Sequence, residues 1–202
     1  MTFAAPLSVS FPTADGGTVS ADVYGERGHD AIVLAHGKVF DKTSWRPFAE
    51  LLAGRGFYVL AFDFRGYGKS VAGKTDDALF EDVLAAVRHL RHDGAPHVAV
   101  IGGSMGAAAA AHAAVVAQPG EIDRLVLLSP PDVATPERLQ GRLLFVASAD
   151  EPLAERVRQA YARAPEPKRL VLLPGSAHAQ HIFATDQSDR LRTTIIDFLT
   201  EK

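Results

Sequence analysis

The chain contains no cysteine among its 202 residues, and it has only one tryptophan and two methionines. Without cysteine, neither a disulfide framework nor a cysteine-ligated metal site can form, and a reducing compartment suffices for folding. The 21 Lys and Arg residues nearly balance the 24 Asp and Glu residues, and no run of five or more basic residues occurs. A surface for nucleic acid or an anionic membrane is therefore not expected.

A secretory leader is not expected either. Met1–Ser10 has neither a basic region nor the apolar core that such a leader requires, so we expect a cytoplasmic protein. The segment Val98–Gly120 carries no formal charge over about the length of a membrane span. Gly102, Gly103, Ser104 and His112 interrupt it, and we interpret it as a buried strand followed by a buried helix, not as a membrane helix.

The overall composition is that of an ordinary soluble globular domain. Hydrophobic residues make up 47% and charged residues 22% of the chain. No internal repeat, low-complexity tract or long Pro/Gly-rich linker divides the sequence. We therefore predict that residues 1–202 form one domain.

Short apolar runs alternate with amphipathic segments along the chain. Leu7–Phe11 and Val19–Tyr24 surround a turn-rich Ala14–Gly17 and predict an antiparallel hairpin at a sheet edge. Six later runs are typical of parallel strands covered on both faces: 31–35, 57–62, 98–101, 125–128, 143–147 and 170–173.

Stripes of apolar residues at helical spacing predict helices over 43–54, 76–91, 152–163 and 188–200. The expected fold class is therefore α/β: a doubly wound, mostly parallel sheet with an N-terminal antiparallel hairpin and helices on both faces. Ligands bind such folds at the carboxyl ends of the strands.

The strongest local motif is Gly102-Gly103-Ser104-Met105-Gly106, a G-x-S-x-G between an apolar run and an Ala-rich helix. A nucleophile on a strand-to-helix turn needs small flanking residues so that strand and helix can approach each other. The helix that follows directs free N–H groups and a positive partial charge at a developing anion. Ser104 is thus a candidate nucleophile.

Three further motifs follow other predicted strands: His36-Gly37-Lys38, the D-x-R-G-x-G-x-S segment Asp63–Ser70, and Pro174–His178. Together with the serine motif, they resemble the α/β-hydrolase superfamily over nearly the whole chain. In that family the triad runs in the order nucleophile, acid, histidine. The resemblance places the base on His178 and the acid on Asp150.

Alternatives for the triad remain open at this stage. Glu151, beside Asp150, and Asp132, after the preceding strand, compete for the role of the acid. His181 competes with His178 as the base, although we expect it at the rim. His36 is expected to support the oxyanion loop through hydrogen bonds, and Asp63 and Arg65 are expected to organise loops.

The oxyanion hole is expected to consist of the backbone N–H groups of Met105 and Lys38, by the same resemblance. Only Ser129–Gly141 lies where many relatives insert a cap, so we expect a capless protein with an open groove. The expected substrate-binding walls are Val39, Phe40, Tyr67, Pro130, Val133 and Phe183, with Lys38 and Met105 beside them. Because most are apolar, the expected substrate has a small to medium apolar group.

No cofactor or metal is expected. The histidines outside these motifs show no ligand spacing beyond His89 and His92, which we interpret as part of a solvated helix face. The expected function is a serine hydrolase acting on esters or thioesters through an acyl-enzyme. A peptidase or amidase, an acyltransferase, and a non-catalytic binding module on the same fold are the alternatives.

Overall fold

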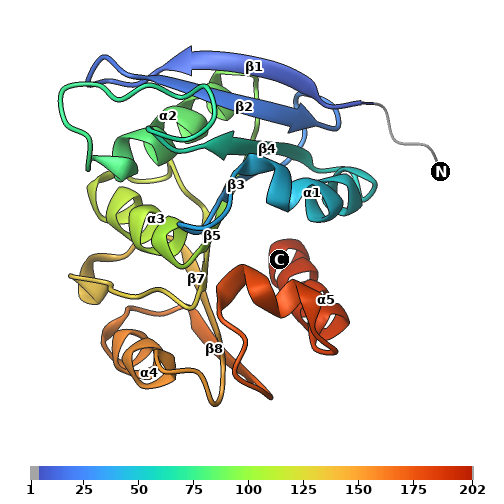
Figure 1. The fold of residues 1–202 in the computed structure, drawn as a ribbon, viewed down its shortest axis with the longest axis vertical. Helices are drawn as coiled ribbons and strands as arrows, with labels where there is room; N and C mark the ends of the chain where they lie inside the picture. Colours follow the sequence, from blue (N-terminus) through green and yellow to red (C-terminus); the bar gives the residue numbers. More distant parts are fainter. Residues whose placement is uncertain (1–4, 202) are drawn as a thin grey trace.

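The computed structural model describes residues 5–201, so the N-terminal segment Met1–Ser10 lies partly outside the described residues. Its centre is an eight-stranded sheet in the order β1-β2-β4-β3-β5-β6-β7-β8 (Figure 1). The strands are β1 (Leu7–Pro12), β2 (Thr18–Tyr24), β3 (Ala31–Ala35), β4 (Tyr58–Asp63), β5 (Val98–Gly103), β6 (Arg124–Leu128), β7 (Arg142–Ser148) and β8 (Lys168–Leu173).

The sheet combines an antiparallel edge with a parallel body. β1 pairs antiparallel with β2, and β2 pairs antiparallel with β4. From β4 to β8 all neighbours are parallel; Val33 of β3, for example, lies between Leu60 of β4 and Val100 of β5. The predicted fold class, with its hairpin at the edge, is confirmed.

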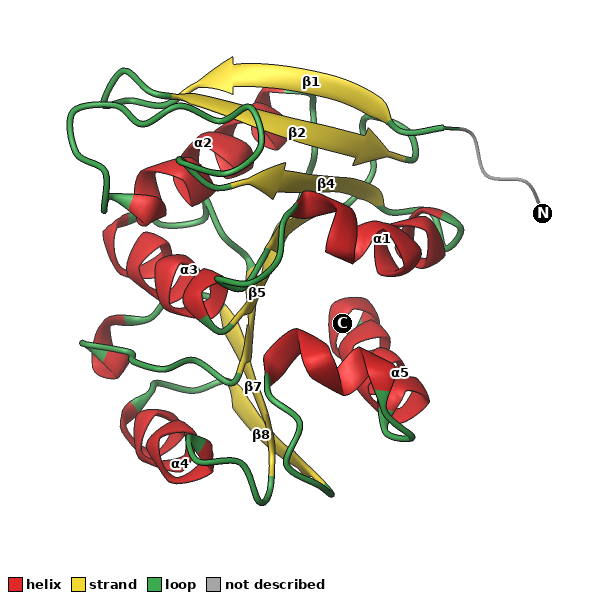
Figure 2. Cartoon of the chain, viewed as in Figure 1, coloured by secondary structure: helices red, strands yellow, loops and turns green. Residues whose placement is uncertain are grey.

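Helices cover both faces of the sheet, as Figure 2 shows. α1 (Arg46–Ala53) and α5 (Ser188–Thr200) lie on one face, and α2 (Leu79–His92), α3 (Met105–Val116) and α4 (Ala154–Arg163) on the other. Three 3-10 helices complete the structure: η1 (Lys42–Trp45), η2 (Pro136–Arg138) and η3 (Ala179–Ala184).

Each face of the sheet has its own apolar core. Trp45, Phe48 and Phe198 pack on the α1/α5 face, and Phe62 and Phe145 pack on the α2/α3/α4 face. Burying one such large side chain contributes about 1.5–3 kcal/mol. The uncharged segment Val98–Gly120 forms the central strand β5 and the Ala-rich helix α3, as predicted. Among the described residues, no helix combines the length and apolarity needed to cross a membrane.

Because the central strands are parallel, their carboxyl ends lie on the same side of the sheet, and the predicted motifs meet there. His36 follows β3, Ser104 follows β5, Ser129 follows β6, and Glu151 comes three residues after the end of β7. The connection from β6 to β7 contains only the short helix η2, and no cap lies between them. The carboxyl ends of the strands are therefore left open to ligands.

Candidate active site

Ser104 occupies a strained turn between β5 and α3. Its backbone has φ 50° and ψ −114°, a conformation that residues with a Cβ rarely adopt. The Ser104 N–H donates to the carbonyl of Leu128 over 2.9 Å, and the Ser104 carbonyl accepts from the N–H groups of Ala107 and Ala108. These bonds hold the strained conformation and project the side chain beyond the end of the strand.

Two glycines make the strained turn possible. A Cβ at Gly102 would lie 2.4 Å from the carbonyl oxygen of Gly106, and a Cβ at Gly106 would lie 2.3 Å from that of Ala35. Both distances are below any tolerable contact with backbone. The glycines of the motif therefore let α3 begin directly against β5 and the end of β3.

Ser104, His178 and Glu151 form a hydrogen-bonded line. The Ser104 Oγ lies 2.8 Å from His178 Nε2, and His178 Nδ1 lies 2.6 Å from Glu151 Oε2. Because an ionised carboxylate only accepts hydrogen bonds, the histidine proton must be on Nδ1. The lone pair on Nε2 then faces the serine hydroxyl, which is the arrangement that general-base activation requires.

The expectation that Asp150 faces the histidine is wrong: Glu151 occupies that position. After β7 the chain makes a turn in which the Glu151 N–H approaches the Ser148 carbonyl, 3.4 Å away, and this returns residue 151 to the strand end. Glu151 is 4% exposed, whereas Asp150 lies on the outside of the turn and is exposed. The other alternative, Asp132, is exposed and lies at a groove described below.

The second oxygen of Glu151 has its own fixed partners. Glu151 Oε1 accepts from Ser129 Oγ at 2.5 Å and from the Ser148 N–H at 2.9 Å. Ser129, with φ 46°, also accepts from the N–H of Ala179, the residue after the histidine. Ser129 was not among the residues predicted for the site, although its place at the end of β6, next to β7, is a usable signal. Ser129 therefore links the acid to the histidine loop.

His36 holds the loop that was predicted to supply the second oxyanion donor. Its Nδ1 donates to the Gly37 carbonyl at 2.9 Å, and its Nε2 accepts from the Phe64 N–H at 3.2 Å. The Gly37 carbonyl and the Lys38 N–H belong to one planar trans peptide, in which they point in opposite directions. Fixing the carbonyl therefore fixes the direction of the Lys38 N–H, and the supporting position expected for His36 is confirmed.

Burial of His36 favours the neutral form of its ring. The side chain is fully buried, and burial lowers the pKa of His36 below its usual 6.5. A protonated ring would have no acceptor for the Phe64 N–H. The buried neutral form thus satisfies both hydrogen bonds, and it excludes His36 as a titrating base at neutral pH.

Gln180 and Tyr67 complete the support of this loop. Gln180, 6% exposed, accepts from the Gly37 N–H through Oε1 at 2.6 Å and donates through Nε2 to Ser44 Oγ at 2.9 Å. The Tyr67 hydroxyl donates to the Lys38 carbonyl at 2.9 Å. Gln180 lies two residues after His178, so the histidine loop and the oxyanion loop are hydrogen-bonded to each other. No motif in the sequence pointed to Gln180.

The predicted loop-organising residues behave as expected. Asp63 accepts from the backbone N–H and the ammonium group of Lys42, at 2.9 and 2.7 Å. Arg65, 4% exposed, joins Asp15 in the hairpin turn to Asp82 in α2. The Arg65 guanidinium, by its hydrogen bonds, holds the pKa of the Asp15 carboxyl well below its usual range.

Few of the residues predicted to form substrate-binding walls line the groove beside Ser104. Beside Ser104 lies a groove of about 690 Å³, and of the six predicted wall residues only Val133 lines it; Lys38 and Met105 line it as well. Val39 is 77% exposed, Phe40 packs on His181, and Pro130 lies at a neighbouring depression. Phe183 packs on Trp45 and Phe48, and Tyr67 packs edge-on against His36.

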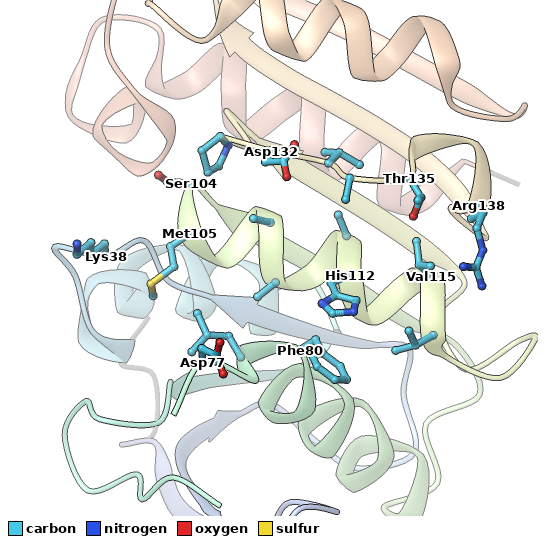
Figure 3. A pocket seen from close by; sticks show the side chains of 18 residues that line it. Lys38, Asp77, Phe80, Ser104, Met105, His112, Val115, Asp132, Thr135 and Arg138 are labelled. Atoms are coloured by element: carbon cyan, nitrogen blue, oxygen red, sulfur yellow. The ribbon is translucent and has the colours of Figure 1, made fainter. Parts of the chain in front are cut away.

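The course of the groove has a structural cause. The groove is formed by the exposed side of α3, by the start of α2 and by residues 131–138 of the connection from β6 to β7 (Figure 3). His181 is exposed and packs on Phe40. Within the described residues, no group of three or more His, Asp or Glu side chains is arranged to hold a metal ion.

The strained serine turn, the hydrogen-bonded line and the mostly parallel sheet define the class of protein. A family model of the alpha/beta hydrolase fold matches residues 30–162, and the chain belongs to this family. It is similar to an uncharacterized protein of Mycobacterium tuberculosis, Rv2307c, with 29% identity over 178 residues, and to the uncharacterized YfhR of Escherichia coli, with 27% identity over 197 residues.

These matches cover 73% and 83% of this chain, which spans 62% and 69% of the lengths of the two relatives. Among solved structures, the esterase Pf2001 of Pyrococcus furiosus superposes with a TM-score of 0.83 at 22% identity, covering 98% of this chain and 92% of that one. A thioesterase domain from the curacin biosynthetic pathway gives 0.74 at 17% identity, covering 96% and 100%. At these identities, the structural likeness establishes the fold alone.

Proposed function

We propose that the protein is a serine hydrolase that cleaves carboxylic esters or thioesters through an acyl-enzyme on Ser104. The observation that carries this proposal is the line Ser104–His178–Glu151, with distances of 2.8 and 2.6 Å, mounted on a strained turn at the mouth of a groove. Function belongs to the site and not to the fold. The names of the structural neighbours, an esterase and a thioesterase, agree with the proposal.

Acylation begins with transfer of the Ser104 proton to His178 Nε2 while Oγ attacks the carbonyl carbon of the substrate. Glu151 stabilises the imidazolium that forms and keeps the ring oriented. The carbonyl electrons move to the oxygen, which accepts hydrogen bonds from the N–H groups of Met105 and Lys38. Met105 is the first residue of α3, where a helix leaves N–H groups without intrahelical partners.

Collapse of the tetrahedral intermediate expels the leaving group. His178 returns the proton to the leaving oxygen or sulfur, and the acyl group remains on Ser104. Water then occupies the place of the leaving group, loses a proton to His178 and attacks the acyl carbonyl. A second collapse breaks the bond to Ser104 Oγ, which takes back the proton from His178, and it releases the carboxylic acid.

Esters and thioesters are preferred over amides in this proposal. An amide nitrogen is a poorer leaving group, and it requires substrate anchoring on both sides of the bond. The walls around Ser104 are mainly apolar, and the side away from His178 opens into the groove. The experiment must therefore distinguish the proposed hydrolase from three alternatives: a peptidase or amidase, an acyltransferase, and a non-catalytic binding module.

The test compares the wild-type protein with Ser104→Ala on a panel of esters, thioesters and one matched anilide, with and without an alcohol acceptor. The variant should fold normally and lose about 10⁴–10⁶ of turnover. Cleavage of the anilide at the rate of the ester, acyl transfer that outruns hydrolysis, or full activity of the variant would each overturn the proposal.

A further inference from the structure

The groove of about 690 Å³ begins at Ser104 and follows helix α3. Figure 3 shows Ser104 and Met105 at one end and Val115 and Arg138 at the other. From Ser104 to Val115 the backbone advances by roughly 16 Å at about 1.5 Å per residue. The groove is thus long and continuous with the nucleophile.

The lining of the groove is apolar along most of this length. Ala108, Ala111 and Val115, at spacings of three and four, present small side chains from α3. Phe80 forms one wall, where it packs against His112 with ring centroids 4.1 Å apart, and Val133 lies on the opposite wall. A straight trough with small residues on its floor fits a narrow, flexible apolar group better than a bulky one.

The position of His178 decides which half of an ester lies in this trough. Lys38 and Met105, the expected oxyanion donors, line the groove together with Ser104, whereas His178 does not. His178 must deliver a proton to the leaving atom, so the leaving group lies on the histidine side. The acyl group then extends away from His178, along α3.

We propose that the groove along α3 binds the acyl chain of the substrate, and that this chain is unbranched and of medium to long length. C–C bonds of about 1.5 Å in a tetrahedral zigzag advance by roughly 1.25 Å each, so the groove accommodates about a dozen methylenes. This chain is longer than the small to medium group expected from the sequence. The identity of the acyl substrate rests on the proposed function; the binding of the chain is tested separately.

The first test measures kcat/KM for p-nitrophenyl esters from two to sixteen acyl carbons, each below its micellar concentration. Complete burial of one methylene corresponds to about fourfold in affinity. We expect kcat/KM to rise at least tenfold from four to ten carbons and to level off near twelve. A maximum at two to four carbons would overturn the proposal.

Two substitutions in the groove act as length markers. Ala108 lies one helical turn beyond Ser104 and is half-buried, whereas Val115 lies near the far end. Ala108→Phe should lower the ratio of kcat/KM for the twelve-carbon ester to that for the four-carbon ester at least tenfold. Val115→Trp should shorten the preferred acyl chain by fewer carbons than Ala108→Phe does. The matched control is Ala162→Phe on the exposed side of α4, which should leave this ratio as in the wild type.

The second test measures fatty-acid binding in the absence of turnover. A fluorescent fatty acid is bound to Ser104→Ala protein and displaced by saturated fatty acids of increasing length, with Ala108→Phe added in the same background. Displacement should strengthen with chain length and weaken at least tenfold in the double variant. Binding that ignores both chain length and Ala108→Phe would overturn the groove assignment.

The proposed hydrolase function and the proposed acyl-chain groove can be contradicted independently of each other. Ser104-dependent hydrolysis with a flat chain-length profile contradicts the groove and leaves the hydrolase intact. Length-dependent fatty-acid binding by a protein that cleaves none of the esters supports the groove and contradicts the hydrolase.

Discussion

Glu151 and its neighbour Asp150 both carry a carboxylate, but the two side chains point in different directions. Its carboxylate is buried and accepts from Ser129, the Ser148 backbone and His178, whereas Asp150 faces solvent. A buried acceptor with three fixed donors can hold the histidine in one tautomer. The pair therefore offers a matched comparison of two adjacent acids.

We expect Glu151→Gln to lower kcat by about 10³–10⁴, because an amide at this position no longer selects the proton on Nδ1. Asp150→Asn should stay within about threefold of the wild type. Steady-state kinetics on one activated ester, with circular dichroism to verify folding, checks both values. A strong loss in Asp150→Asn with an active Glu151→Gln would return the acid to residue 150.

At the residue scale, the motifs in the sequence pointed to Ser104 and His178, and the structure places these two side chains within hydrogen-bond distance. Glu151 was the alternative to Asp150, and the structure places Glu151 against His178. Ser104 and His178 were recognisable because glycines and strand ends surround them in the sequence. The choice between residues 150 and 151 depends on one turn after β7, and two adjacent acids in a turn look alike in sequence. Ser129 was missed because its φ of 46° and its buried hydroxyl are consequences of tertiary structure.

At the scale of elements, Gln180 joins two loops that follow different strands. Its side chain bonds the Gly37 N–H in the oxyanion loop from the start of η3, directly after the catalytic histidine proposed above. A shift of one loop is therefore transmitted to the other. This makes Gln180 a positioning residue, because it has no contact with reacting atoms.

We predict that Gln180→Leu lowers kcat about ten- to a hundredfold with little change in KM, which is less than the 10²–10³ for complete loss of an oxyanion donor. Leaving the buried Gly37 N–H unpaired should also cost about 1–3 kcal/mol of unfolding free energy. Kinetics and urea unfolding measure the two effects.

The matched control for this prediction is Ser44→Ala, which removes only the outer partner of Gln180. It should leave kcat within about twofold of the wild type. Equal kinetics for Gln180→Leu and the wild type would show that the two loops are independent.

Most elements were predictable, and their ends were less so. The run 31–35 matches β3 without adjustment, while the segment 43–54 divides into η1 and α1 between Trp45 and Arg46. α2 begins at Leu79, three residues later than predicted. Local periodicity identifies an element, but neighbouring segments decide where it begins.

At the scale of the whole molecule, a buried neutral histidine couples folding to pH. Burial lowers the pKa of His36 in the folded state, while the unfolded state keeps the usual value of about 6.5. Below that pH the unfolded chain binds a proton that the folded chain does not. The free energy of unfolding therefore falls as the pH drops below about 6.5, and is at its full value above it.

We expect urea unfolding between pH 7.5 and 5 to show a decline to which His36 contributes at most about 1.4 kcal/mol per pH unit. His36→Gln should flatten this slope, whatever its effect on absolute stability. His29→Gln, at an exposed position, is the control. An unchanged slope in His36→Gln would show that this histidine is not the group responsible.

The general architecture followed from the sequence because six apolar runs and the hairpin could form few other sheets. An open groove was expected from the sequence, but its course along α3 was not. The sequence predicted that the helix α3 is buried, yet the short connection from β6 to β7 leaves one side of the helix exposed in the groove. Without a cap, the exposed surface of α3 depends on how α2 packs beside it. The pattern of a single sequence does not predict this packing.

The account depends most on Ser104 being an activated nucleophile. The measurement that tests this most directly is reaction of the folded protein with a fluorophosphonate, followed by peptide mass spectrometry, with Ser104→Ala as the control. We predict a single adduct on Ser104 and none in the variant. A folded wild-type protein without an adduct, or an adduct on another serine, would contradict the account.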